Sequence, residues 1–413
     1  MRNSIGYLLV ILGFLSPTAQ RAQAQSYELL FKQLMAEQPA EAFSAKKVLM
    51  DTEGQEYSVQ GSVGMFKYTS PNDKTPRTIV YYLPKSIANP HDLNSKQKTL
   101  VFLHGGGAST MSDQGATDVA KMYIQDFINY SEEKKVLLIF PTSSFGWNNP
   151  TSHFLRNFLK FSKAKIAINE DQLVLSGHSM GGMGITREYP KITDLFSGVL
   201  ALSAGTQAHM LDEELIVPYL NGTPYTHING DDDHFQEFKP RMLAFQAKLE
   251  AVEKKYNLKS KFKLIFRPGG HNYDLPQTLG ELENLFQQPL NRFPKFFQAR
   301  YEVFHFTASG HDPEVNAIVD SAFWVKLNGF DTKPSTEVES KGVYLMVKVE
   351  GQKVILTPKD DELNATSVSL TLSKELLDLK KTVEVSYDGK EIFKGMLPPS
   401  TQSDGNVVME LKL

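Results

Sequence analysis

The sequence contains no cysteine in its 413 residues. This absence excludes disulfide bonds, thiolate metal ligands, a cysteine nucleophile and any lipid anchor attached through cysteine. Charge of one sign is also scarce, because the net charge is −3 and no long basic run occurs. A field that weak does not hold a polyanion, so we expect no nucleic-acid partner. After the N-terminus, no window reaches the ~18 consecutive apolar residues that a membrane-spanning helix needs.

The N-terminus has the pattern of an export signal. Arg2 precedes an almost wholly apolar run at residues 5–15, and the small-x-small tripeptide Ala-Gln-Ala follows at 22–24. The run is too short for a stable spanning helix but suits a signal peptide. The alternative, an amphipathic helix, lacks a polar face. We expect cleavage after Ala24, a secreted or periplasmic mature chain, and no stable membrane insertion once the signal is removed.

The chain from about residue 78 to 268 alternates short apolar runs with longer amphipathic segments. Continuous apolar runs of this length are typical of strands buried on both faces of a parallel sheet. The segment 241–256 lies between two of them and places apolar residues on one face of a helix. Alternating strand and helix predicts an α/β fold with a mostly parallel, doubly wound sheet. The expected strands lie at 79–82, 100–103, 136–140, 173–175, 199–202, 225–228 and 264–266.

The pattern changes to a period of two after about residue 292, which indicates a smaller β-rich domain. Asp388 and Gly389 form the dipeptide of a hairpin turn. We therefore expect a signal peptide at 1–24, a catalytic domain at 25–292 and a C-terminal accessory domain at 293–413. No cluster of acids, bases or metal ligands marks a second activity there, and Trp324 is expected in its core. The alternating segments are 341–356, 368–372 and 383–387, with 391–393 after the turn.

The pentapeptide GHSMG at 177–181 follows the expected strand at 173–175 and fits the Gly-x-Ser-x-Gly pattern. This motif is informative when a strand precedes it and a helix follows, as here. A sharp bend of that kind forces Ser179 into strained dihedrals and exposes its hydroxyl, while the flanking glycines avoid clashes. The alternative is a tight turn that merely needs small residues. We expect Ser179 to be a nucleophile.

A serine nucleophile needs a general base and an acid that orients the base. His271 follows the expected strand at 264–266, and Gly269 and Gly270 before it leave the loop free to bring the ring over Ser179. Active-site residues at the carboxyl ends of parallel strands are what an open α/β sheet predicts. His271 is therefore the expected base. Ten histidines are present, and His234, beside an acidic cluster, is the main competitor.

The orienting acid is expected in the acidic cluster at 231–233, after the strand at 225–228. Asp233 is the first choice and Asp232 the second, because three adjacent aspartates cannot all serve one imidazole. The alternatives for this cluster are a solvated turn, a calcium site, or a metal-dependent hydrolase site that uses residues 231–234.

A glycine run after another strand end supplies a site for the oxyanion. His104 and the three glycines at 105–107 directly follow the strand at 100–103. Backbone N–H groups of Gly106 and of Met180, just after the nucleophile, can point at the negative oxygen of a tetrahedral intermediate. A glycine loop could instead bind phosphate, but no Gly-Lys-Ser/Thr follows it.

Taken together, these motifs resemble the α/β-hydrolase superfamily over about residues 75–285. The chain looks like exported esterases of the polyhydroxybutyrate depolymerase and feruloyl esterase type, and like the catalytic domain of prolyl oligopeptidase-like peptidases. The resemblance implies Ser179 as nucleophile, His271 as base, Asp233 as acid, and oxyanion donors at Gly106 and Met180. It implies neither cofactor nor metal. Pro190 departs from the pattern, because a proline there should end or kink the helix after the elbow.

The substrate class follows less directly from the sequence. A gated oligopeptidase needs a propeller of about 40 to 45 residues per blade, and the stretch ahead of the core strands is too short for one. An exported serine hydrolase acting on a small-molecule or polysaccharide-linked carboxylic ester is expected, through an acyl-enzyme. An ungated serine peptidase and a catalytically dead scaffold used for binding are the alternatives. Phe145, Trp147 and His178 are candidate substrate-pocket residues, although Phe145 and Trp147 could equally anchor a packed loop.

Overall fold

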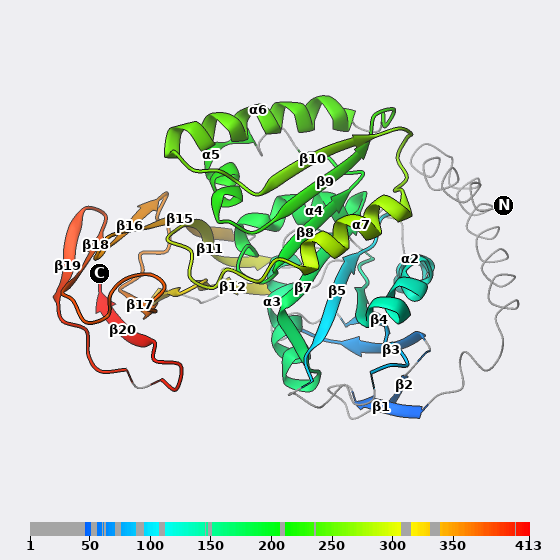
Figure 1. The fold of residues 1–413 in the computed structure, drawn as a ribbon, viewed down its shortest axis with the longest axis horizontal. Helices are drawn as coiled ribbons and strands as arrows, with labels where there is room; N and C mark the ends of the chain where they lie inside the picture. The colour runs from blue at the N-terminus through cyan, green and yellow to red at the C-terminus, as the bar shows by residue number, and fades with distance from the viewer. Residues whose placement is uncertain are drawn as a thin grey trace, which may run out of the picture.

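The computed structural model describes the greater part of the chain from residue 46 onward (Figure 1). The expected export signal and its cleavage position lie outside the described residues. Within the described part, no helix is both long and apolar enough to cross a membrane. The described residues are 46–50, 56–59, 61, 63–70, 76–87, 95–106, 112–144, 146–147, 151–206, 211–234, 237–306, 315–330, 339–400 and 402–413.

The larger part of the molecule is built on an eight-stranded sheet in the order β3-β4-β6-β5-β7-β8-β9-β10. The pairs β3–β4 and β4–β6 are antiparallel, and the strands from β6 to β10 run parallel. This confirms the predicted mostly parallel sheet. The strands are β3 (Val63–Tyr68), β4 (Arg77–Tyr82), β5 (Gln97–Leu103), β6 (Val136–Pro141), β7 (Ile168–His178), β8 (Gly198–Leu202), β9 (Tyr225–Gly230) and β10 (Phe262–Arg267).

Helices cover both faces of this sheet, which explains why its central strands contain continuous apolar runs. Along β5, Val101 and Leu103 enter a core with α3, α4 and α6, whereas Leu100 and Phe102 enter another core with α2 and α7. All four side chains are fully buried. The helical segments are α2 (Asp113–Lys134), α3 (Thr151–Lys165), α4 (Met180–Glu188), η5 (Tyr189–Lys191), α5 (Glu213–Ile216), η7 (Val217–Leu220), α6 (Phe238–Tyr256) and α7 (Leu275–Phe286).

Each of the seven predicted strands of this region lies in a strand of the sheet, and the predicted helix at 241–256 lies in α6. The expected end of the helix after the elbow is also confirmed, because α4 stops at Glu188 and Pro190 lies in the short helix η5. Strand β3 and the small β1–β2 pair (Lys46–Met50 and Glu56–Val59) were not predicted. Edge strand β3 alternates irregularly between buried and exposed side chains, so its sequence shows no continuous apolar run.

The C-terminal region forms two further sheets that share one apolar core, which confirms the predicted β-rich region. Trp324 is buried in that core. The segment 341–356 is not one strand, because a turn at Gly351 divides it into β15 and β16. Asp388 and Gly389 both have positive φ and join β18 to β19, as predicted for a hairpin turn. The strands are β11 (Phe296–Phe306), β12 (Val315–Val319), β13 (Ser321–Ala322), β14 (Val325–Asn328), β15 (Glu339–Glu350), β16 (Lys353–Lys359), β17 (Ser367–Leu372), β18 (Val383–Tyr387), β19 (Lys390–Gly395) and β20 (Val407–Lys412).

Strand β11 joins the two regions by packing on η5 and η7. Lys191 Nζ lies 3.0 Å from the carboxylate of Glu302 and 3.5 Å from that of Glu188, and all three side chains are buried. Asn221 and Gln298 exchange two hydrogen bonds of 3.0 Å between side chain and main chain. The contact between the regions therefore includes buried polar pairs that are specific in their register.

Candidate active site

Ser179 occupies a sharp bend between the end of β7 and the start of α4. Its φ of 54° and ψ of −114° lie in a region that non-glycine residues rarely adopt. The bend is held by a hydrogen bond from its N–H to the carbonyl of Leu202 (2.9 Å). A Cβ at Gly177 would lie 2.8 Å from the carbonyl carbon of Gly181, so a larger residue does not fit there. The strained serine predicted from the motif is present.

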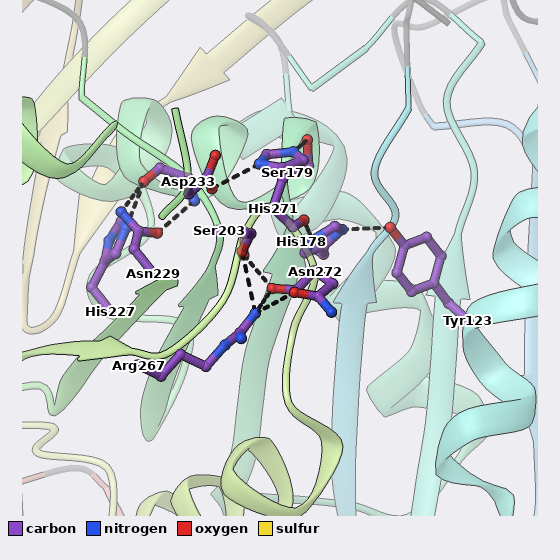
Figure 2. A network of polar contacts seen from close by, with 12 residues as sticks. Tyr123, His178, Ser179, Ser203, His227, Asn229, Asp233, Arg267, His271 and Asn272 are labelled. Carbon is purple, nitrogen blue, oxygen red and sulfur yellow. Dashed lines mark hydrogen bonds and ion pairs between the residues drawn. The ribbon is translucent and has the colours of Figure 1, made fainter. Parts of the chain in front are cut away.

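The imidazole of His271 lies between Ser179 and Asp233 (Figure 2). Its Nε2 is 2.7 Å from Ser179 Oγ, and its Nδ1 is 2.8 Å from Asp233 Oδ2. A carboxylate accepts hydrogen bonds, so Nδ1 carries the proton and Nε2 is left to accept from the serine hydroxyl. Asp233 is 3% exposed, which shields this hydrogen bond from water. This tautomer allows His271 to take the hydroxyl proton.

The other members of the acidic cluster point elsewhere. Asp231 Oδ1 accepts a hydrogen bond from the N–H of Gly269 (3.2 Å), so its carboxylate holds the segment before His271. Asp232 and His234 are exposed. Within the described residues, no group of three or more histidine, aspartate or glutamate side chains could hold a metal ion. The geometry thus brings Asp233, and neither of its neighbours, to the imidazole.

The segment 268–272, which holds the imidazole of His271 beside Ser179, is fastened on several sides. Arg267 donates to the carbonyl of Pro268 (2.9 Å) and to Asn272 Oδ1 (2.9 Å). Ser203 Oγ donates to the carbonyl of Asn272 (2.8 Å). A Cβ at Gly230 would lie 2.1 Å from the carbonyl oxygen of Gly269, which shows how closely this segment packs on the end of β9.

The glycine loop after β5 lies against the elbow. A Cβ at Gly181 would lie 2.0 Å from the carbonyl oxygen of Leu103, at the end of β5. Gly106 adopts a φ of 118°, which favours glycine. Residues 107–111 lie outside the described part of the chain. Gly106 lies on the glycine loop and Met180 lies at the start of α4, and these two segments are in direct contact. The role of their amides as oxyanion donors stays a prediction.

His104 anchors the base of this loop. Its Nε2 accepts from the N–H of Ser143 (3.0 Å), and its Nδ1 donates to the carbonyl of Gly105 (2.9 Å). Burial lowers the pKa of His104 to about 4, so the ring is neutral near pH 7. Trp147 Nε1 donates to the carbonyl of His104 (2.9 Å), and this indole is 1% exposed. Trp147 is thus a buried anchor of the loop. This is the alternative stated for it above, and not the expected place in a substrate pocket.

The other two candidate pocket residues differ from each other. Phe145 lies outside the described residues. His178 is described and is 6% exposed. Its ring turns away from solvent and contacts Tyr123 of α2 (2.6 Å between Nδ1 and Oη) and the carbonyl of His271 (3.0 Å from Nε2). The sequence carried no sign of this pairing, since Tyr123 lies within an ordinary amphipathic helix.

A further buried histidine, His227 of β9, contacts the turn after β8. His227 Nε2 donates to the carbonyl of Ala204 (2.9 Å), and burial lowers the pKa of His227 to about 4. The side chain of Asn229 accepts a hydrogen bond from the N–H of Ala204 (2.9 Å) and donates one to the carbonyl of Ala204 (2.8 Å). The turn after β8 is therefore held next to the end of β9.

The sheet order and the strained serine at the strand-to-helix bend define the α/β-hydrolase fold. No protein-family model matches the sequence, and a search of curated proteins finds no match. Solved structures of similar fold include a thermostable esterase, which is 17% identical, with 58% of this chain and 70% of that one covered and a TM-score of 0.43. Another is a ferulic acid esterase (17% identity, 55% and 98% covered, TM-score 0.41). A third is the poly(3-hydroxybutyrate) depolymerase LpqC from Bordetella parapertussis (18% identity, 54% and 94% covered, TM-score 0.41).

Proposed function

We propose that the chain is an exported serine hydrolase that cleaves carboxylic esters through Ser179, His271 and Asp233. The observation that carries this proposal is the hydrogen-bond chain of 2.7 and 2.8 Å from the serine hydroxyl through the imidazole to a buried carboxylate. A serine hydroxyl becomes a useful nucleophile when a positioned base takes its proton. Its strained, partly exposed position at the elbow supports the same role.

The proposed reaction has two halves. Ser179 Oγ attacks the acyl carbon while His271 Nε2 takes the hydroxyl proton, and Asp233 stabilises the resulting imidazolium. The amides of Gly106 and Met180 bind the oxyanion. The leaving alcohol departs with the proton from His271, which leaves an acyl-enzyme. Water then attacks that ester with His271 as base, and the carboxylic acid and the free serine are released.

The ester is the favoured substrate class on chemical grounds. An alkoxide leaves a tetrahedral intermediate more easily than an amine does, so a triad that cleaves peptides also cleaves activated esters. The converse does not hold, because peptide cleavage also demands protonation of a poor leaving group. A small-molecule or polysaccharide-linked ester is therefore the proposed substrate, and an amide is the outcome that a substrate panel would have to reveal.

The direct test is the Ser179→Ala variant. We expect it to fold as the wild type does and to lose hydrolysis of p-nitrophenyl acetate by at least ~10³-fold in kcat. A serine-directed phosphonate should label the wild type at Ser179 and inactivate it, whereas a chelator should not. Near wild-type turnover by the variant would end the proposal. Loss of activity on chelation, without labelling, would favour a metal-dependent hydrolase.

The role of the acid has a matched pair of variants. Asp233→Asn should lower kcat by about 10⁴-fold, because the amide favours the wrong imidazole tautomer. Asp232→Asn changes the neighbouring, exposed carboxylate and should leave kcat unchanged. Equal effects of the two substitutions would contradict the assignment of Asp233.

The acyl and alcohol groups can be found with purified protein and a panel of short acyl esters, methyl ferulate, acetylated sugars and prolyl amides. Cleavage of the amides would identify a peptidase. No cleavage and no phosphonate labelling would identify a binding scaffold. Export is tested by sequencing the N-terminus of protein recovered outside the cytoplasm, where the proposal expects the mature chain to begin at Gln25.

A further inference from the structure

The segment that carries His271 is held at its main chain by a side chain of the nucleophile elbow itself. His178 Nε2 lies 3.0 Å from the carbonyl oxygen of His271, and Figure 2 shows the His178 ring between that segment and Tyr123. The ring is 6% exposed, so this hydrogen bond forms away from water, where it is stronger and more costly to leave unmade.

The protonation of His178 follows from its partners. A carbonyl oxygen accepts hydrogen bonds, so Nε2 of His178 must carry a proton. Burial and the nearby His271 lower the pKa of His178 to about 3, so the ring is neutral and Nδ1 is an acceptor. The hydroxyl of Tyr123, 2.6 Å from Nδ1, therefore donates to it. Burial raises the pKa of Tyr123, which keeps that hydroxyl protonated. Tyr123 thus selects the tautomer in which His178 can hold the His271 carbonyl.

His178 also touches other parts of the site. It is bonded covalently to Ser179, and a Cβ at Gly105 would lie 3.1 Å from its carbonyl oxygen and 3.2 Å from its Nδ1. The nucleophile, the glycine loop and the segment of the base therefore meet at this one residue. Building on the proposed function, we propose that His178 is a positioning residue, which sets the distance between the His271 imidazole and Ser179 through its hydrogen bond to the His271 carbonyl, with Tyr123 fixing its tautomer.

A purely structural role of His178 and a positioning role predict different results for three variants. His178→Leu fills similar space but leaves both the Tyr123 hydroxyl and the His271 carbonyl without this partner, so it also loses stability. The double variant His178→Leu with Tyr123→Phe removes the orphaned hydroxyl, and stability should recover in part, because replacing both partners of a buried bond is far less costly than replacing one. His178→Gln places an amide N–H near the position of Nε2 and serves as the conservative variant.

The experiment measures kcat and KM for p-nitrophenyl acetate, together with urea unfolding, for the wild type and these three variants. A displacement of about 1 Å in a catalytic group costs about 100-fold, so we expect His178→Leu to lose about that factor in kcat with little change in KM. The double variant should keep the low kcat although its stability recovers. His178→Gln should regain at least a tenth of the wild-type kcat. The low-field proton resonance of His271 Nδ1 should weaken in the leucine variants and return with glutamine.

The outcomes separate this proposal from the proposed function. Ser179→Ala is measured alongside, and its inactivity establishes the nucleophile independently of His178. If Ser179→Ala is inactive while kcat of the double variant rises with its stability to the wild-type value, His178 is structural and the positioning role is overturned. An unchanged low-field resonance of His271 Nδ1 in His178→Leu would also overturn the positioning role, and this result does not depend on which substrate the enzyme cleaves. If Ser179→Ala is active, the proposed function fails first, and the resonance alone decides whether His178 positions the His271 ring.

Discussion

Replacing Gly181 by alanine tests whether the close approach of the elbow helix to β5 is needed for catalysis. A Cβ at Gly181 would lie 2.0 Å from the carbonyl oxygen of Leu103 and 3.0 Å from that of His104. Ordinary contacts between such atoms begin near 3.5 Å, so α4 or the glycine loop must move by about 1 Å or more. Each of these segments carries one proposed oxyanion donor, Met180 on the helix and Gly106 on the loop.

The expected size of the effect follows from that displacement. Misplacing a catalytic group by about 1 Å costs about 100-fold, and losing one oxyanion donor costs about 3 to 4 kcal/mol of transition-state stabilisation, which is the same range or larger. Overpacking costs about 1 to 3 kcal/mol of stability, offset in part by the better helix propensity of alanine. We therefore expect kcat/KM for p-nitrophenyl acetate to fall at least about 100-fold, with a smaller loss in the unfolding free energy measured in urea.

Gly280→Ala is the matched control, since Gly280 lies in α7 and nothing lies within 4 Å of its added Cβ. It should leave kcat/KM unchanged and raise stability by about 0.5 to 1 kcal/mol, because alanine restricts the unfolded chain and favours the helix. Wild-type kcat/KM in Gly181→Ala would refute the reasoning, because it would mean that the contact of α4 with the glycine loop does not set the oxyanion site.

The remaining predictions concern stability. Burial lowers the pKa of His178 to about 3 and of His104 and His227 to about 4, whereas the unfolded chain takes up these protons below about 6.5. Each ring should therefore remove about 1.4 kcal/mol of stability per pH unit as the pH falls from about 6.5 to 4, and a melting temperature unchanged from pH 7 to pH 5 would contradict this. Lys191→Met leaves the buried carboxylate of Glu188 without a counter-charge, although Glu302 keeps its ion pair with Arg300, and should cost about 3 to 5 kcal/mol in urea unfolding. Lys255→Met, at an exposed ion pair, should cost much less than Lys191→Met, and equal losses of the two variants would argue against a special role for burial.

The sheet and the chain order of the candidate site could be predicted because they depend on local patterns. Apolar runs mark strands buried on both faces, and parallel strands bring their carboxyl ends to one edge. Ser179, Asp233 and His271 each follow such a run, so their approach is a consequence of topology. The structure places Asp233 and not Asp232 beside His271, for a reason that the sequence does not contain: the segment before His271 engages Asp231, and Asp232 stays in solvent.

The contacts that hold the site could not be predicted, because they join segments far apart in the chain with no pattern of their own. Tyr123 lies 55 residues from His178, in a helix whose polar and apolar positions look ordinary. The glycines before His271 suggested freedom, yet Arg267 binds the carbonyls around them. Glycine is compatible with either a mobile loop or a closely packed one. Which of the two forms depends on contacts with residues that are distant in the sequence.

The ion pairs of Lys191 could not be predicted for the same reason, because they join segments far apart in the chain. They affect how the C-terminal strands join the larger sheet. Lys191 follows α4 by three residues, and Glu302 lies on β11. Burying a charge costs several kcal/mol, and attraction recovers this only when the counter-charge is opposite it. Separating the two regions would return these charges to water, so the network adds little to the strength of the contact. It does penalise other registers of β11, because each would remove the close pair of Lys191 and Glu302 from this buried network. Since α4 begins directly after Ser179, the register of β11 also restrains the far end of the helix that carries the amide of Met180.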